Sequence, residues 1–448
     1  MSRILTPRGD EINEHVEADA EATQHDTRRK SKKSGEGGRL AWTRYDTGWT
    51  ISLFGTAIGA GILFLPINAG AGGLWPLLIV TLLIGPMTYL SHRALARMVC
   101  GSRRPGDDIT VVVRDFFGEG AGKLVTVLYF AAIYPIVLIY GVGITNTVES
   151  LMINQLGLAP MPRWILSGVL IALMMLVMVA GQRVMILVTE WLVYPLIVVL
   201  LAVTVYLIPS WKLDGAMLEV PAAGDLLMSL WMVIPVLVFA FNHSPAISQF
   251  SLAMKGRYGQ AAPDKAAQIL QRTSILLVIF AMGFVWSSVL SMGKDGLLAA
   301  REANLPVLSY VANVQGTPFI AYLGPVVAIT AIASSFFGHY LGAAEGLGGI
   351  VRGFVDSDGS RISDRRLSMA IAAFMFLTTW GAAIANPSIL SLIESLSGPV
   401  IAAVLYLMPM YAIHKVPALQ KYRGRASNVF VTLAGIVAVG GILLSFLR

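Results

Sequence analysis

Three glycines interrupt the first long apolar run of the chain. Gly55, Gly59 and Gly61 lie within Phe-Gly-Thr-Ala-Ile-Gly-Ala-Gly-Ile-Leu-Phe-Leu-Pro, residues 54–66. Backbone that tends to unwind is tolerated at membrane depth only where it lines a protein cavity, because a lipid-facing helix must satisfy its own polar groups. Unwinding would expose carbonyl groups, which suit a cation, and amide groups, which suit a carboxylate. The alternative is that these glycines only permit close helix packing.

A second interruption follows in the sixth apolar run, at Phe-Ala-Phe-Asn-His-Ser-Pro, residues 239–245. Ser244 followed by Pro245 is typical of a helix start, with a capping residue before proline at the first helical position. A half-helix beginning there would direct its positive end and unpaired backbone into a cavity, where Asn242 and His243 could hydrogen-bond a polar substrate. The alternative is a proline kink whose polar groups are satisfied internally.

The eighth apolar run presents a face of small and polar residues. Ser334, Ser335 and the carbonyl of Ala331 share that face, and such oxygen atoms are the ligands that a hard cation prefers. A tight helix interface is an equally good explanation of the small residues. His339 and Glu345 are ionisable groups within the same run. With His243, they are candidates for a proton relay.

The elements that must position these residues are membrane-spanning helices. The chain has 448 residues, of which 56% are hydrophobic and 13% charged, and its mean hydropathy is +0.70. This composition predicts an all-α polytopic membrane protein. The single Cys100 excludes an internal disulfide and a multi-cysteine metal site. Eleven apolar runs are long enough to span a bilayer, at about 47–70, 74–98, 122–149, 164–181, 184–208, 225–252, 273–292, 318–345, 367–385, 387–412 and 427–447.

Charge predicts the orientation of these spans. Nearly all of the 33 Lys and Arg residues fall in segments on the same side as the N-terminus, which predicts a cytoplasmic N-terminus and, with an odd number of spans, a C-terminus outside. The same bias explains the net charge of +7, so we expect no nucleic-acid partner. Residues 1–44 are polar and predicted to be disordered, and their basic run at 28–33 is expected to lie near anionic lipid.

The two interrupted spans lie five spans apart. Corresponding breaks in two halves predict an inverted repeat of five plus five helices, with a substrate site near the midplane where the breaks meet. The first repeat would cover residues 45–210 and the second residues 211–413, and residues 414–448 would add the eleventh span. The long connection 293–317 is apolar enough to fold back as a lid or as a packed loop.

The motifs of this chain resemble those of the bacterial hydroxy and aromatic amino acid permease family, in the amino acid-polyamine-organocation superfamily. The resemblance is closest to its serine and threonine transporter branch. It implies import of a small amino acid, usually serine or threonine, across the bacterial inner membrane by a proton-coupled symporter with the leucine-transporter (LeuT) type of fold. The motifs are Asp46-Thr-Gly-Trp49, Gly55-Thr-Ala-Ile-Gly-Ala-Gly61, His92-Arg-Ala-Leu-Ala-Arg97, Ile144-Thr-Asn-Thr147, Phe241-Asn-His-Ser-Pro245, Phe337-Gly-His-Tyr-Leu-Gly342, Asn386-Pro-Ser-Ile389 and Met408-Pro-Met-Tyr-Ala-Ile413.

One departure from the family concerns the coupling ion. The serine and threonine transporters carry a lysine where this chain has Ser334, and a lysine ammonium could replace a sodium ion. The local pattern also resembles the sodium site of sodium-coupled members of the wider fold. That resemblance favours Na⁺ as the coupling ion, with H⁺ as the alternative, and no other cofactor is expected. The matching positions are Gly55, Ile58, Ala331, Ser334 and Ser335.

The predicted substrate is an amino acid, L-serine before L-threonine. Its carboxylate would lie on the amides near Gly59 and Gly61, its amino group on carbonyls of the two breaks, and its side chain near Asn242. Alternatives are an aromatic amino acid as substrate, or a transceptor that binds without net transport. An enzyme is not expected, because the histidines lie in separate segments without ligand-like spacing. The predicted substrate contacts are Thr56, Ile58, Gly59, Ala60, Gly61, Tyr134, Phe239, Phe241, Asn242, His243 and Ser244.

Overall fold

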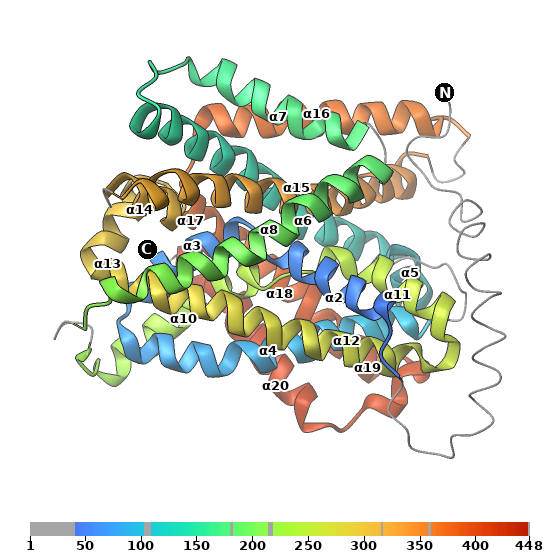
Figure 1. Ribbon diagram of the computed structural model, residues 1–448. Helices are drawn as coiled ribbons and strands as arrows, with labels where there is room; N and C mark the ends of the chain where they lie inside the picture. Colours follow the sequence, from blue (N-terminus) through green and yellow to red (C-terminus); the bar gives the residue numbers. More distant parts are fainter. Residues whose placement is uncertain are drawn as a thin grey trace.

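The computed structural model describes residues 41–102, 109–179, 182–213, 218–314, 317–356 and 360–446. These residues form a bundle of long helices (Figure 1), and no strand occurs among them. Most of the N-terminal tail, predicted to be disordered, lies outside the described residues. The first described helix begins at one end of the bundle, which we call the N-end. We call the other end the opposite end.

The first span is broken, as the glycines predict. Helix α2 (Arg44–Ala57) begins with a capping box, in which Thr43 and Asp46 bond each other's backbone amides. It ends where Ile58 turns to an extended conformation, and α3 (Ala60–Ala71) starts after Gly59. The two helices are bent by 56° at this break.

The second predicted break is also present. Helix α10 (Ala223–Ala240) ends before Phe241, and α11 (Ser244–Tyr258) begins with Pro245 in its first turn. Both breaks therefore lie where local sequence signals place them. The segment between α10 and α11 is buried, so its backbone groups must find partners within the protein.

Long unbroken helices surround the two broken ones. Helices α6 (Glu119–Ser150) and α15 (Pro318–Phe354) pack against each other along their lengths (Figure 1). Two small residues of α15 permit this approach, because a Cβ on Gly342 would lie 3.0 Å from Ile133 and one on Gly346 3.1 Å from Phe130. Gly342 and Gly346 therefore do permit close packing of α15 against α6, as the alternative interpretation of the small residues predicts.

The remaining elements complete the bundle. In the first half they are α4 (Leu74–Cys100), α5 (Ile109–Phe117), η1 (Leu151–Gln155), α7 (Arg163–Val179), α8 (Gln182–Tyr206) and η2 (Ile208–Ser210). In the second half they are η3 (Gly259–Ala261), α12 (Ala262–Leu277), η4 (Val278–Met282), α13 (Gly283–Glu302), α14 (Val307–Val314), α16 (Asp364–Ala385), α17 (Ile389–Leu392), η5 (Ile393–Ser397), α18 (Gly398–Ala402), η6 (Ala403–Leu407), α19 (Met408–Lys415), η7 (Pro417–Tyr422) and α20 (Ala426–Phe446).

By length and composition, seven helical runs of the described chain could each cross a membrane, or eight if the bent pair α2 and α3 counts as one span. The sequence predicts eleven spans, and particular segments account for the difference. Residues 244–302 form one long run that includes α11, α12 and α13, whereas 163–178 and 426–441 form shorter apolar helices. The predicted tenth span is divided into short pieces by the π-helical segments η5 and η6.

In the predicted connection 293–317, the described residues up to 314 fold back onto the bundle. Its helix α14 packs against α15, and Leu308 and Val311 are buried there. A Cβ on Gly324 of α15 would lie 2.7 Å from the carbonyl oxygen of Leu308, so the two helices are in close contact.

Candidate substrate and ion site

The break between α2 and α3 lies directly against α15. The Ser335 hydroxyl donates to the carbonyl of Thr56 at 3.1 Å, and the Tyr140 hydroxyl of α6 lies 2.7 Å from the same Ser335 oxygen. A Cβ on Gly59 would lie 2.5 Å from that oxygen and 2.8 Å from the Tyr140 hydroxyl. Only glycine therefore fits at position 59 with these neighbours in place.

The two breaks also touch each other. A Cβ on Gly61 would lie 2.7 Å from the Cα of Ala240 and 2.7 Å from the Phe239 ring. The start of α3 therefore meets the end of α10, with Phe239 and Phe241 buried beside it. Thr56 lies at the other side of the break, with its methyl group 3.6 Å from the position of a Cβ on Gly338.

The starts of the two half-helices differ in how their amides are satisfied. At α11, the Asn242 side chain accepts the amide of Ser244 at 3.0 Å, and the His92 ring of α4 accepts the amide of His243 at 3.1 Å. At α3, Gly59 has no side chain that could cap the helix. The Ile62 amide bonds the Gly59 carbonyl at 3.2 Å, and the amides before Ile62 have no partner within the helix. The positive end of α3 is therefore the one available to an anion.

His243 is directed toward α4. Its ring stacks on His92 with centroids 3.5 Å apart and planes 7° from parallel, and its Nδ1 donates to the carbonyl of Phe241. His92 Nδ1 bonds the carbonyl of Thr88 at 2.8 Å, which leaves Nε2 as the acceptor for the His243 amide. The Asn242 amide nitrogen and the His243 Nε2 are buried and make no hydrogen bond to the part of the chain that the structure describes.

The candidate cation ligands fall into two groups. Ser334 donates to the carbonyl of Ala331 at 3.1 Å, within α15, whereas Ser335 reaches across to the α2 carbonyl of Thr56. Gly55 faces α8, because a Cβ there would lie 2.7 Å from Val193. All three α15 residues and Ile58 are buried, and the Ser335 hydroxyl brings one oxygen atom of α15 to the end of α2.

The tyrosine at the break is Tyr140 rather than Tyr134. The Tyr134 ring stacks between Phe130 and Phe374 of α16, with centroids 4.8 and 5.5 Å away. Six residues turn a helix by about 600°, so positions 134 and 140 occupy different faces of α6. The sequence predicts Tyr134 as a substrate contact, whereas the structure places the Tyr140 hydroxyl beside Ser335.

Of the relay candidates on α15, His339 lies at the break. Its Nδ1 bonds the carbonyl of Ser335 at 2.8 Å, and its ring meets Tyr140 edge to face with centroids 5.3 Å apart. Glu345 lies about 9 Å further along α15 toward the N-end. His243 lies on the other side of the second break, against α4, so the three candidates do not form one cluster.

A buried ion pair joins α2 to α12 at the N-end. Lys265 lies 2.7 Å from the Asp46 carboxylate, and both side chains are completely buried. Asp46 also accepts the Tyr258 hydroxyl at 2.5 Å and the Thr43 amide at 2.8 Å. These contacts connect the ends of α2, α11 and α12, which closes the N-end.

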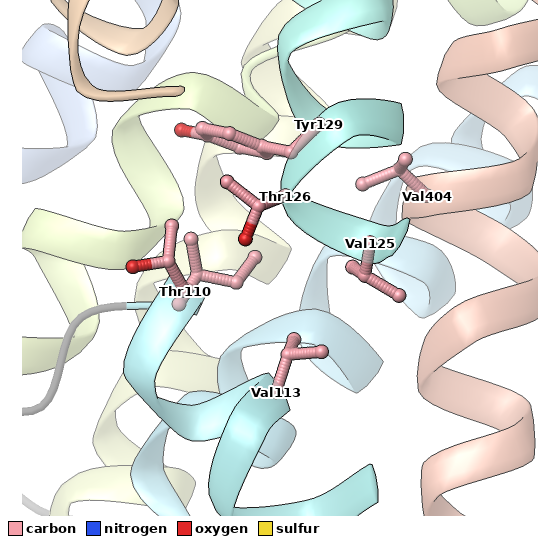
Figure 2. A pocket seen from close by; sticks show the side chains of 7 residues that line it. Thr110, Val113, Val125, Thr126, Tyr129 and Val404 are labelled. Carbon is pink, nitrogen blue, oxygen red and sulfur yellow. The ribbon is translucent and has the colours of Figure 1, made fainter. Parts of the chain in front are cut away.

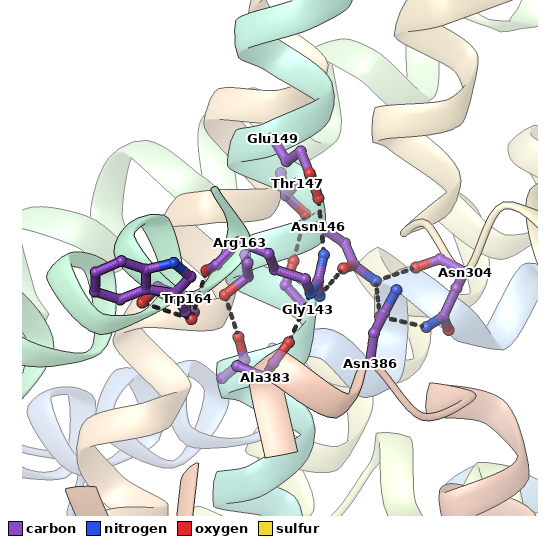
Figure 3. A network of polar contacts seen from close by, with 12 residues as sticks. Gly143, Asn146, Thr147, Glu149, Arg163, Trp164, Asn304, Ala383 and Asn386 are labelled. Atoms are coloured by element: carbon purple, nitrogen blue, oxygen red, sulfur yellow. Dashed lines mark hydrogen bonds and ion pairs between the residues drawn. The ribbon is translucent and has the colours of Figure 1, made fainter. Parts of the chain in front are cut away.

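Polar networks connect the helices at the opposite end. In Figure 3 the Arg163 guanidinium bonds Glu149, Asn146 and the carbonyl of Ala383, at 2.7, 2.5 and 2.7 Å. Asn146 in turn donates to the Asn304 carbonyl and to the Asn386 side chain, each at 3.0 Å. Elements α6, α7, α16 and the connection before α14 are held together.

A second contact at this end reaches the first broken span. Glu394 accepts the Asn68 amide of α3 at 2.7 Å and pairs with Arg301 of α13 at 3.2 Å. Both ends of the bundle are thus closed in this conformation. The Glu394 contacts have only weak signals in the sequence, because each joins residues of ordinary type that are far apart in the chain.

The recess in Figure 2 is small. It is lined by α5, α6 and Val404, and it is too narrow for a water molecule. In the described part of the chain, no group of three or more His, Cys, Asp or Glu side chains could hold a metal ion. The site at the breaks is therefore built from backbone groups, hydroxyls and amides.

The chain is similar in sequence to known amino acid transporters. The chain is 49% identical over 427 residues to the serine transporter SdaC of Escherichia coli K12, covering 94% of this chain and 99% of the relative. It is 40% identical over 427 residues to the threonine/serine transporter TdcC of Yersinia enterocolitica, covering 91% and 97%.

Two solved structures show the fold. MhsT in complex with L-phenylalanine matches with a TM-score of 0.56 at 15% identity, covering 92% of this chain and 99% of that chain. A mutant of the Eremococcus coleocola manganese transporter matches with a TM-score of 0.59 at 14% identity, covering 92% and 90%. These likenesses agree with the predicted LeuT-like arrangement.

The pattern of the tryptophan/tyrosine permease family matches residues 47–442. This match spans both breaks, α15 and most of the last helix α20. With the apolar helices described above, it identifies a multi-pass membrane protein. The predicted family resemblance is confirmed, and the chain belongs to the tryptophan/tyrosine permease family.

Proposed function

We propose that this protein is a secondary active symporter that imports a small amino acid, L-serine before L-threonine. The observation that carries the proposal is the α3 start, whose first amides are uncapped where the two breaks meet. A substrate carboxylate would satisfy these amides and interact favourably with the helix dipole. The names of the relatives, a serine transporter and a threonine/serine transporter, support this substrate class.

The substrate side chain would meet Asn242. Its amide nitrogen is buried without a partner in the described chain, so it can donate to a hydroxyl at little desolvation cost. The amino group would bond the carbonyls at the end of α2, near Ile58. Since His243 is directed toward α4, we assign it to the support of the α11 start rather than to direct contact with the substrate.

The coupling ion in this proposal is Na⁺. The Ser334 and Ser335 hydroxyls and the carbonyls of Gly55, Ile58 and Ala331 would be its ligands, all of them oxygen atoms. Proton coupling is the second candidate, and it is supported by His339, whose ring lies against Tyr140 and the Ser335 carbonyl. Transport itself changes no chemical bond.

Alternating access would open one end of the bundle at a time. In the proposed topology, eleven spans comprise repeats at 45–210 and 211–413 and an additional span in 414–448. The N-end would face the cytoplasm of a bacterial cell and the opposite end the outside, with the C-terminus outside. The excess of Lys and Arg in segments on the N-terminal side supports this orientation.

Uptake of radiolabelled serine into proteoliposomes tests the proposal. With separate sodium and proton gradients, we expect uptake to follow sodium, and undiminished uptake without sodium would refute sodium coupling. Ser334→Lys should abolish sodium stimulation, because its ammonium would occupy the cation position. Ser334→Ala is the matched control, because it removes the hydroxyl without adding charge. It should weaken sodium stimulation of uptake but not abolish it.

A binding panel separates the remaining alternatives. An aromatic substrate is the main alternative, since the family description names tryptophan and tyrosine. Stronger binding of tryptophan or tyrosine than of serine would overturn the substrate assignment. Serine binding without uptake would identify a transceptor.

A further inference from the structure

Four cationic side chains gather at the N-end, where α4 approaches η7 and the start of α20. Figure 1 draws α4 and α20 at the lower edge of the bundle, and the two helices are in contact. The Tyr422 ring is the centre of the group. The Arg97 guanidinium lies 4.4 Å from its centroid, the Lys421 ammonium 5.1 Å and the Arg425 guanidinium 5.4 Å. We call Arg93, Arg97, Lys421 and Arg425 the Tyr422 cluster.

Arg93 extends this cluster along α4. It lies one turn before Arg97, with its guanidinium 4.8 Å from the Tyr89 ring. One of its nitrogens donates to the Ser427 hydroxyl at 3.4 Å, at the beginning of α20. The cations therefore line the junction of α4 and α20 from both sides.

None of these four cations has a carboxylate partner in the part of the chain that the structure describes. Arg97 is only 7% exposed, and its Nε, like that of Arg93, is buried without a hydrogen-bond acceptor among those residues. Like charges held this close repel one another, and a buried N–H group without an acceptor bears a desolvation cost. An anion at the junction would relieve both.

The surface next to the cluster is suited to acyl chains. Beyond Arg425, successive turns of α20 present Val429 and Leu433, which are 62% and 58% exposed, and Ile436 continues the same stripe. A phosphate at the junction would thus lie where the apolar helix α20 begins. Guanidinium groups bind phosphate oxygens with paired donors, and basic pockets between membrane helices hold lipid head groups.

We propose that the Tyr422 cluster binds the phosphate of an anionic phospholipid in the leaflet at the N-end. Arg97 and Arg93 supply the buried donors, and Arg425 and Lys421 complete the site at the membrane surface. Nearby exposed apolar side chains of α20 contact the acyl chains. This site is separate from the substrate breaks and does not depend on which amino acid is transported.

Native mass spectrometry of the purified full-length protein tests this site. The protein is titrated with phosphatidylglycerol and with phosphatidylcholine of the same acyl chains. We expect one phosphatidylglycerol to bind in preference to phosphatidylcholine, and Arg97→Gln to weaken that binding by at least about tenfold, the factor given by one hydrogen bond to a charged group. Arg425→Gln, at an exposed position, should also weaken it.

Arg366→Gln is the matched control, because it removes an exposed cation at the start of α16, away from the cluster. It should leave lipid binding unchanged. Equal binding of both lipids, or equal binding by wild type, Arg97→Gln and Arg425→Gln, would overturn the proposal. Displacement of phosphatidylglycerol by inorganic phosphate would assign the cluster to soluble phosphate and overturn the lipid assignment.

Discussion

Removal of Lys265 should open the N-end. Its ammonium is completely buried against the Asp46 carboxylate at 2.7 Å, and it also donates to the Ala41 carbonyl at 2.8 Å. Lys265→Met would leave a buried carboxylate without its cation, which costs about 3–5 kcal/mol in the closed state. Donors from Tyr258 and Thr43 remain, so we take about 3 kcal/mol, or roughly a hundredfold shift toward the open state.

The single cysteine makes this shift measurable. In a Cys100→Ser background, Thr50→Cys introduces a thiol that is buried in α2, one turn beyond Asp46. The rate of its modification by a membrane-impermeant maleimide follows the open population when opening and closing are fast. We expect Lys265→Met to raise this rate by about a hundredfold.

Two controls make the result specific to the ion pair. Arg272→Gln removes another cation of α12. The Arg272 guanidinium lies 3.8 Å from the Trp42 ring and has no carboxylate partner in the described chain. Its removal should therefore change the free energy of unfolding by less than about 0.5 kcal/mol. The double variant Asp46→Asn, Lys265→Met should recover most of the closed population, because no buried charge remains. An unchanged rate in Lys265→Met, or an equal rise in Arg272→Gln, would refute the reasoning.

Three further predictions concern the breaks and the opposite end. Gly59→Ala should abolish serine binding measured by calorimetry, because the added Cβ would lie 2.5 Å from the Ser335 oxygen. Gly48→Ala is the control, because its added Cβ would have nothing within 4 Å, and it should bind serine normally. Equal affinities of the two variants would contradict the crowding argument. Ser335→Ala should lower stability by about 1 kcal/mol per lost hydrogen bond and remove any sodium-dependent rise in melting temperature. A retained sodium-dependent rise would exclude Ser335 as a ligand. Glu394→Gln should speed serine dissociation less than tenfold, because a partly exposed ion pair contributes about 0.2–1 kcal/mol. Stopped-flow dissociation rates check this, and rates that do not depend on salt in the wild type would contradict a role for the ion pair.

The breaks were predictable from sequence because their signals are local. Glycines that unwind a helix and a Ser-Pro pair that starts one act within a single turn, so both breaks lie where these residues place them. The polar face of α15 also follows from helical spacing alone, and Ser335 indeed reaches the end of α2.

The partners of these residues were not predictable in the same way. The choice between Tyr134 and Tyr140 depends on which face of α6 meets α15, and the direction of His243 depends on His92, 151 residues earlier in the chain. Asp46 and Lys265 illustrate the same difficulty, because nothing near either residue indicates the other. Such contacts are set by helix packing, which local patterns do not encode.

The ion pairs at the two ends differ in their exposure to solvent. Asp46 and Lys265 are completely buried, whereas the side chains of Arg301 and Glu394 are 36% and 15% exposed. Salt and water screen an exposed pair but hardly affect a buried one, so separation at the opposite end requires less free energy. In the orientation that we propose, the outer end would then open more readily than the cytoplasmic end, and raised ionic strength would favour that opening without loosening the cytoplasmic exit.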